Sequence, residues 1–212
     1  MSLEIRVPTP VFDAKAVLGG NLIGPGEVAK VTQLSYSAEG IRALEESLPP
    51  LERLRWCKGN GYVVIAGPPT PLSIFDMMQI DSSIFAWEGR TAGSSGFVGR
   101  DDRFVKESRV QSGWLAIRKG FTVHGNETWD EQVAHLSSVE RVATAAEAVW
   151  SLMIYGKVYG FPISGSVRLR TSDKSSNNER VLVGWFDRRT IGITTAPDRF
   201  REFNVRMSSV LK

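Results

Sequence analysis

A turn, an apolar run and a Gly-Pro-Pro segment follow one another in residues 58–71, KGNGYVVIAGPPTP, and raise the question of a phosphate-binding loop. Such a loop needs backbone N–H groups that point at the phosphate, a Lys that reaches it, and a Ser or Thr hydroxyl for the metal. Here three prolines after Gly67 remove three N–H donors, and no Lys follows them. We therefore predict a buried strand over 62–66 that leaves through a rigid proline loop, without phosphate-binding chemistry.

The single cysteine, Cys57, is the only candidate for a thiol nucleophile. Its neighbours Arg55 and Lys58 would lower the thiol pKa, and His124 or His135 would act as the base. Cys57 also lies at the end of a predicted helix, where a lone cysteine usually packs as a small buried hydrophobe. We favour the buried role. One cysteine also excludes an intramolecular disulfide and a cysteine-rich zinc site.

A short charged cluster suggests a second kind of chemistry, that of a metal-dependent nuclease, because carboxylates hold divalent cations and a Lys assists at the attacked phosphate. The cluster consists of Asp101, Asp102, Lys106 and Glu107. The strand that follows ends in Lys119 without an acid two residues before it, so the usual arrangement is missing. The two histidines do not have the close spacing of a zinc pair. We expect no metal and no cofactor.

Basic residues are concentrated in the last quarter of the chain. From Lys157 to Lys212 there are 11 Lys and Arg against 5 Asp and Glu, a net charge of +6, whereas the whole chain carries +3. Arginine suits bidentate contacts with anions and stacking. We predict nucleic acid or another anionic partner here; the alternative is that these charges only solubilise an exposed face. The candidate contacts are Arg168, Arg170, Lys174, Arg180, Arg188 and Arg189.

The same region has the two-residue period of strands. SVRLRT at 166–171 alternates polar and apolar residues, and further strands are predicted over 180–187 and 191–195, after short polar turns. Together they predict an antiparallel three-stranded meander over about 166–195. Alternation places Arg168 and Arg170 on its solvated face.

Helical patterns fill the first two-thirds of the chain. Residues 37–55 predict two helices in tandem, because the proline pair at 49–50 ends one helix and starts another. Thr128 and Glu131 have the spacing of a capping box, which predicts a short helix. The apolar stretch 72–80 is compatible with either a helix or a strand.

The strongest single element is a long amphipathic helix over about 138–156. Apolar residues recur there at three- and four-residue steps and form one stripe. Ser137 and Glu140 repeat the capping-box spacing at its start, and Gly156 is a natural stop. Trp150 and Met153 on the stripe are predicted to lie in the core.

These elements predict the α+β class, with the long helix packed on the apolar face of the C-terminal meander. At 212 residues the chain fits a single globular domain over 1–212. A short strand is predicted at 3–7. Residues 87–103, WEGRTAGSSGFVGRDDR, contain four glycines and predict a flexible loop.

The composition, 42% hydrophobic and 23% charged residues, is that of a water-soluble globular protein. No apolar run approaches the roughly 18 residues that a membrane span requires, so no membrane partner is expected. The N-terminus lacks the apolar core of a signal peptide, and a cytoplasmic location is the default expectation.

Because no catalytic motif survives, we favour a binding or interaction module that contacts nucleic acid or another anionic partner, rather than an enzyme. Two alternatives stay open. One is a hydrolase or nuclease-like enzyme with a dispersed site. The other is a structural or assembly protein that forms homo-oligomers, with some of its six tryptophans at subunit contacts.

Overall fold

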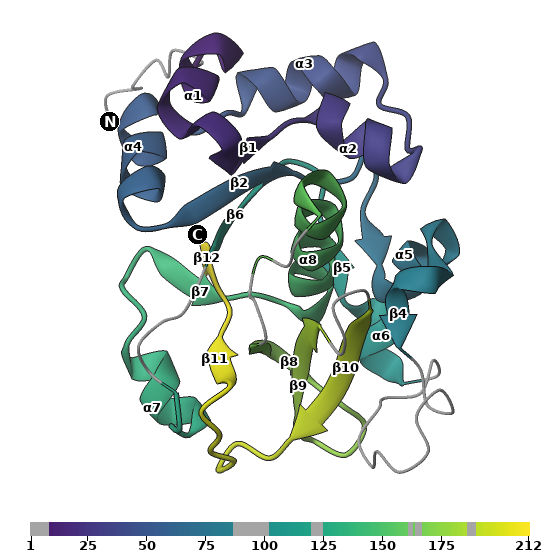
Figure 1. Ribbon diagram of the computed structural model, residues 1–212, viewed down its shortest axis with the longest axis vertical. Helices are drawn as coiled ribbons and strands as arrows, with labels where there is room; N and C mark the ends of the chain where they lie inside the picture. The colour runs from purple at the N-terminus through teal and green to yellow at the C-terminus, as the bar shows by residue number, and fades with distance from the viewer. Residues whose placement is uncertain (1–8, 87–101, 120–124, 161–162, 164–166, 186–189) are drawn as a thin grey trace, which may run out of the picture.

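The computed structural model describes residues 9–86, 102–119, 125–160, 163, 167–185 and 190–212. Over these residues two five-stranded sheets pack on one central helix, α8 (Ala145–Tyr159), so the predicted α+β class is confirmed (Figure 1). The strand expected at 3–7 lies outside the described residues, as does the glycine-rich loop except for its last two positions.

The first sheet has the strand order β1-β2-β6-β12-β7. Its strands are β1 (Leu22–Ile23), β2 (Tyr62–Ala66), β6 (Trp114–Arg118), β12 (Ser209–Leu211) and β7 (Glu140–Val142). β1 runs parallel to β2, and the other neighbours are antiparallel. The strand predicted over 62–66 is β2, and every one of its residues is buried.

The second sheet has the order β11-β8-β9-β10-β4. Its strands are β11 (Val205–Met207), β8 (Arg168–Lys174), β9 (Arg180–Trp185), β10 (Ile191–Ala196) and β4 (Phe85–Ala86). The antiparallel pairs β8–β9 and β9–β10 confirm the predicted meander. Two short strands that the sequence pattern did not reveal, β11 and β4, extend it in parallel at both edges.

The two sheets meet where the chain passes from β11 to β12. Between these strands the Ser208 N–H donates to the carbonyl of Arg170 at 3.1 Å, and its own carbonyl accepts from the Ala143 N–H at 2.8 Å. The Ala143 carbonyl in turn accepts from the Ser172 N–H at 2.9 Å. Backbone hydrogen bonds therefore continue from one sheet into the other below the start of α8.

Helix α8 begins later and ends later than its sequence pattern predicts. The Ser137 N–H and hydroxyl do donate to Glu140 Oε2, but the Glu140 N–H donates to the Ser137 backbone carbonyl, and the resulting turn leads into strand β7. The helix itself is capped by Thr144, whose hydroxyl accepts from the Glu147 N–H, and it ends at Gly160, where φ is +74°. The same Ser/Thr-x-x-Glu pattern thus starts a turn at one position and a helix at the next.

The face of α8 that was expected to be polar is also buried. Every residue from 145 to 155 is buried, since one side packs on the first sheet and the other on the second. Trp150 and Met153 are fully buried, as predicted. The indole N–H of Trp150 donates to the carbonyl of Ala66 at 3.1 Å and so ties the helix to β2.

Four helices precede β2 in the described part of the chain: α1 (Val11–Leu18), α2 (Pro25–Thr32), α3 (Ala38–Glu46) and α4 (Leu51–Gly59). The tandem pair predicted over 37–55 is α3 and α4, separated by the two prolines as expected. α1 and α4 pack on the side of the first sheet that faces away from α8 and form a second core with Tyr62 and Val64 (Figure 1).

The remaining elements are short: η1 (Gly19–Asn21), β3 (Leu72–Ser73), α5 (Ile74–Ile80), η2 (Ser82–Ile84), α6 (Arg103–Glu107), β5 (Arg109–Val110) and α7 (Trp129–Ala134). The stretch 72–80 therefore contains both a strand and a helix. α7 begins at the predicted capping box of Thr128 and Glu131.

The Gly-Pro-Pro loop is closed by contacts within the protein. The Gly67 N–H donates to the carbonyl of Gly113 at 2.6 Å, and its carbonyl accepts from the hydroxyl of Tyr36 at 2.6 Å. A Cβ atom at Gly67 would lie 2.3 Å from the carbonyl oxygen of Gln111, so the backbones approach too closely for a side chain. The glycine serves strand packing rather than a phosphate.

Candidate functional site

The predicted arginine face is partly an interior. Arg170 was expected on a solvated face, but it is fully buried, and this expectation is wrong. Its guanidinium donates to Gln132 Oε1 at 3.0 Å and to the backbone carbonyls of Glu127 and Phe200 at 3.3 and 2.8 Å. The physical reason is that α7 and the segment 197–204 cover this side of the meander.

Most of the other predicted contact residues are paired with acids of the same covering segment. The ion pairs are Arg168 with Glu202, and both Lys174 (3.5 Å) and Arg180 (2.9 Å) with Asp198. The Arg180 guanidinium also lies over the Trp129 ring, 3.6 Å from its centroid. Arg188 and Arg189 lie outside the described residues. The charges of this face therefore serve largely to hold the chain's own C-terminal segment.

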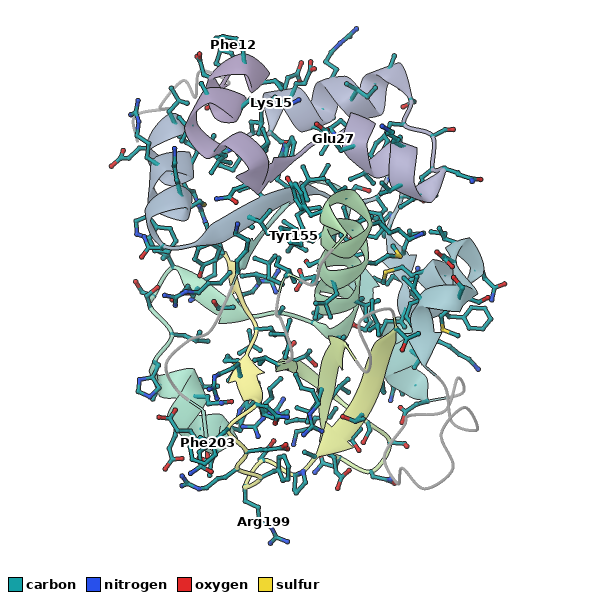
Figure 2. All side chains as sticks on the ribbon, viewed as in Figure 1. Phe12, Lys15, Glu27, Tyr155, Arg199 and Phe203 are labelled. Carbon is teal, nitrogen blue, oxygen red and sulfur yellow. The ribbon has the colours of Figure 1, made fainter. Side chains whose placement is uncertain are left out.

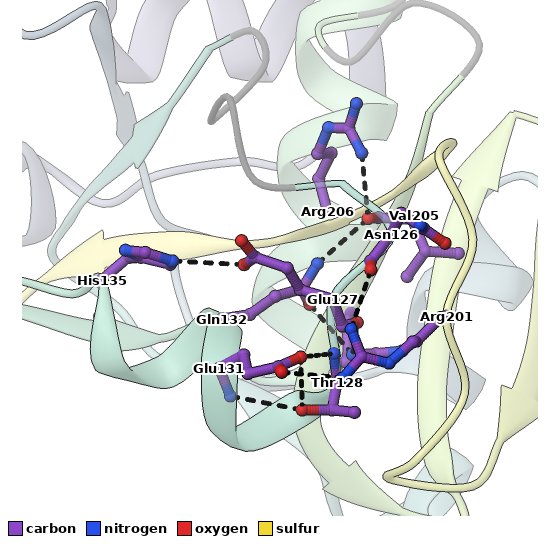
Figure 3. Close-up of polar contacts among 10 residues, drawn as sticks. Asn126, Glu127, Thr128, Glu131, Gln132, His135, Arg201, Val205 and Arg206 are labelled. Carbon is purple, nitrogen blue, oxygen red and sulfur yellow. Dashed lines mark hydrogen bonds and ion pairs between the residues drawn. The ribbon is translucent and has the colours of Figure 1, made fainter.

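Figure 3 shows how the same segment is fixed to α7. Arg201 pairs with Glu131 at 2.7 Å and donates to the carbonyl of Asn126 at 3.2 Å. His135 Nε2 lies 3.2 Å from Glu127 Oε2, so this histidine is in contact with a carboxylate of the same layer. These contacts join three parts of the chain into one polar layer over the meander.

A polar pocket of about 620 Å³ lies between α6 and the turn that joins β8 to β9. It brings the predicted contact residue Lys174 together with Asn178 of the turn and with Arg103 of α6. Arg103 was not predicted, because its approach to the turn depends on tertiary packing across about seventy residues of sequence. Ser175 and Ser176 add hydroxyl and backbone groups to the lining.

The two acids in this pocket are already engaged. Asp173 Oδ2 accepts from Ser108 Oγ at 2.8 Å and from the Ala145 N–H at 2.5 Å, so its charge faces the N-terminus of α8. Glu107 pairs with Arg103 at 2.7 Å, but both side chains are more than half exposed. An exposed pair of this kind is weak and exchanges readily with another anion.

The charged cluster considered for a nuclease does not assemble a metal site in the described part of the chain. Asp102 Oδ2 accepts from the N–H and hydroxyl of Ser176 at 3.3 and 3.1 Å, which links the start of α6 to the β8–β9 turn. No group of three potential metal ligands occurs among the described residues. Asp101 lies outside them.

Cys57 is fully buried, as predicted, and packs against α1 and β2. Burial raises the pKa of its thiol to about 11, despite the opposing charge of Arg53. His135 is engaged by Glu127, and His124 lies outside the described residues. The environment is that of an inert structural thiol.

We therefore expect Cys57 to resist alkylation in the native protein at about pH 8, because a thiol with a raised pKa forms little thiolate there. The same reagent should label it fully after denaturation. Intact-mass spectrometry over time measures both rates. Rapid native labelling would show that the thiol is accessible and would reopen the nucleophile hypothesis.

Comparisons with protein-family models, with curated proteins and with solved structures found no match in any of the three. No helix in the described ranges is both long and apolar enough to cross a membrane. The class defined by the fold is thus an α+β protein with two sheets around one helix and a polar pocket at the edge of the second sheet.

Proposed function

We propose that the protein is a binding module that contacts a phosphate-bearing partner, nucleic acid first among them, through the pocket between α6 and the β8–β9 turn. The observation that carries the proposal is the meeting of two cations, Arg103 and Lys174, with the amide of Asn178 in one concave surface. Phosphate oxygens bind to Arg, Lys, Asn and Ser side chains and to backbone N–H groups.

This pocket is better placed for a partner than the arginine face predicted from the sequence. Arg170 is buried and Arg180 is 15% exposed, so neither can reach a phosphate without loss of its internal contacts. The Arg103 side chain is 80% exposed and that of Lys174 is 34% exposed. Glu107 forms an exposed, exchangeable ion pair with Arg103, and Asp198 keeps its closer partner Arg180, at 2.9 Å, when Lys174, at 3.5 Å, turns to another anion.

Replacing both Arg103 and Lys174 by Ala is expected to weaken oligonucleotide binding about tenfold at low salt, which corresponds to roughly 1.4 kcal/mol. The slope of log K against log salt should become shallower by about 1.4, because about 0.7 of a counterion is released per phosphate contact on a single strand. Fluorescence anisotropy of a labelled single-stranded oligonucleotide, titrated at several salt concentrations, measures both quantities.

The matched control is the double variant Lys30→Ala, Arg42→Ala, which removes the same charge from the exposed surfaces of α2 and α3. It should leave affinity nearly unchanged. Competition with inorganic phosphate separates recognition of a single phosphate group from recognition of a polymer. Equal losses in the two double variants would assign binding to net charge and would reject the pocket.

A further inference from the structure

A half-buried lysine, Lys119, directly follows strand β6 of the first sheet. Its backbone N–H donates to the carbonyl of Gly61 at 2.7 Å, which fixes the chain at this position. Its Nζ lies 2.5 Å from the amide oxygen of Asn21 at the end of η1, and 5.7 Å from the centroid of the Tyr155 ring. The side chain is therefore held between β6, η1 and α8, and none of these residues lines the polar pocket between α6 and the β8–β9 turn.

Two tyrosines of α8 form an aromatic wall, and the lysine lies over the inner one. The ring centroids of Tyr155 and Tyr159, one helical turn apart, are separated by 4.6 Å. Tyr155 is buried at the end of α8 that lies nearest to α1 and α2 (Figure 2). Tyr159 is partly exposed, and its hydroxyl donates to the carbonyl of Gly20. The wall is thus fixed to the fold at both rings and reaches solvent at Tyr159.

No carboxylate of the described residues pairs with Lys119. Glu27, whose charge acts on Tyr159, is engaged by Lys15 at 3.2 Å and by the Gly24 N–H at 3.1 Å (Figure 2). Burial without an opposing acid lowers the pKa of the Lys119 ammonium. At neutral pH more of this side chain is therefore a neutral amine than is the case for an exposed lysine.

Lys157 on α8 shows the opposite arrangement. Its side chain is 26% exposed, and its Nζ lies 2.5 Å from Asp81 Oδ2. A half-buried ammonium with an acid partner keeps its proton, whereas one without a counter-charge loses it more readily. The neutral amine is the form that attacks a carbonyl carbon, and desolvated lysines are those that proteins use for this chemistry.

We propose that Lys119 is an amine nucleophile that binds an aldehyde or ketone as an imine, with the apolar part of that compound against the ring of Tyr159. The neutral Nζ attacks the carbonyl carbon and forms a C–N bond. Loss of one water molecule from the resulting carbinolamine gives the C=N bond, so no oxidant or reductant takes part. The amide oxygen of Asn21 orients Nζ by accepting one of its hydrogens. The aromatic wall favours a carbonyl compound with a flat aromatic group over a short aliphatic one.

The test is reductive trapping on the full chain at about pH 7.5, with benzaldehyde as the probe and cyanoborohydride to reduce the imine to a stable amine. Peptide mapping by mass spectrometry gives the labelling rate at each lysine. Lys119 should be labelled at least about fivefold faster than the exposed Lys30, because its neutral fraction is larger. Lys157, held by Asp81, should be labelled more slowly than either. With propanal the preference for Lys119 should be smaller.

Matched variants separate a binding site from a merely reactive amine. Tyr159→Phe keeps the ring and should keep the preference for benzaldehyde over propanal, whereas Tyr159→Leu should lose it. Both variants lose the hydroxyl bond to Gly20, so only the ring distinguishes them. Asp81→Asn should speed the labelling of Lys157, since it removes the acid partner on the same helix. Labelling of Lys119 no faster than that of Lys30, or the same aldehyde preference in both Tyr159 variants, would overturn the proposal.

Discussion

Replacing Arg170 by Met is expected to lower the free energy of unfolding by about 4 kcal/mol, in the range found when one member of a buried charged network is removed. The guanidinium is fully buried and donates to Gln132, Glu127 and Phe200. Met fills a similar volume, but it removes the donor of one buried contact, to Gln132, and of two partly buried contacts, to the carbonyls of Glu127 and Phe200. Loss of a partner by a buried polar group costs about 1–3 kcal/mol. Urea unfolding followed by circular dichroism measures the loss.

The matched control for this prediction is Arg168→Met, two residues earlier on β8. The Arg168 and Glu202 side chains are 31% and 35% exposed, and ion pairs at such sites contribute only about 0–1 kcal/mol. We expect a small loss there. Equal, small losses at both positions would contradict the buried network, and they would return Arg170 to the solvated face that the sequence pattern predicts.

Elements that follow from local rules were predicted well. The proline pair separates α3 from α4, Thr128 caps α7, and alternation places β8, β9 and β10 in a meander. Each of these depends on contacts within a few residues or on the period of the side chains. A single sequence contains that information.

Elements that depend on distant pairing were missed. β1, β4, β7, β11 and β12 have two or three residues each, which is too short to show a period of two. Their strand character comes from neighbours such as β2, β6 and β8, which are remote in sequence. The two edge strands of the second sheet and the strand order of the first sheet therefore could not be predicted from the sequence alone.

The candidate site illustrates the same limit for side chains. Alternation identifies which residues share a face of β8, but not what covers that face. Leu169 and Thr171 are buried on the face that was predicted to be internal, and Arg170 is buried as well, because α7 and the segment 197–204 occupy the side that was taken for solvent. The cations that do reach a pocket, Arg103 and Lys174, come from two elements that no local pattern connects.

Replacing Trp150 by Ala is expected to lower the free energy of unfolding by about 4 kcal/mol, as for other large-to-small changes at fully buried aromatic residues. The change opens a cavity in the core beside the middle of α8, and it removes the 3.1 Å hydrogen bond from the indole N–H to the Ala66 carbonyl. For a chain of this size the midpoint of thermal unfolding should fall by about 10 °C. Calorimetry and far-ultraviolet circular dichroism measure the two quantities.

The control is Trp56→Ala, which removes a partly exposed tryptophan and should cost less than half as much, since less apolar surface is lost from the interior. The shape of the transition is equally informative. Both sheets pack on α8 within one continuous core, so the Trp150 variant should still unfold in a single step. A small loss with an unchanged midpoint would contradict the central position of Trp150, whereas two separate transitions would show that the sheets are independent folding units joined by the helix.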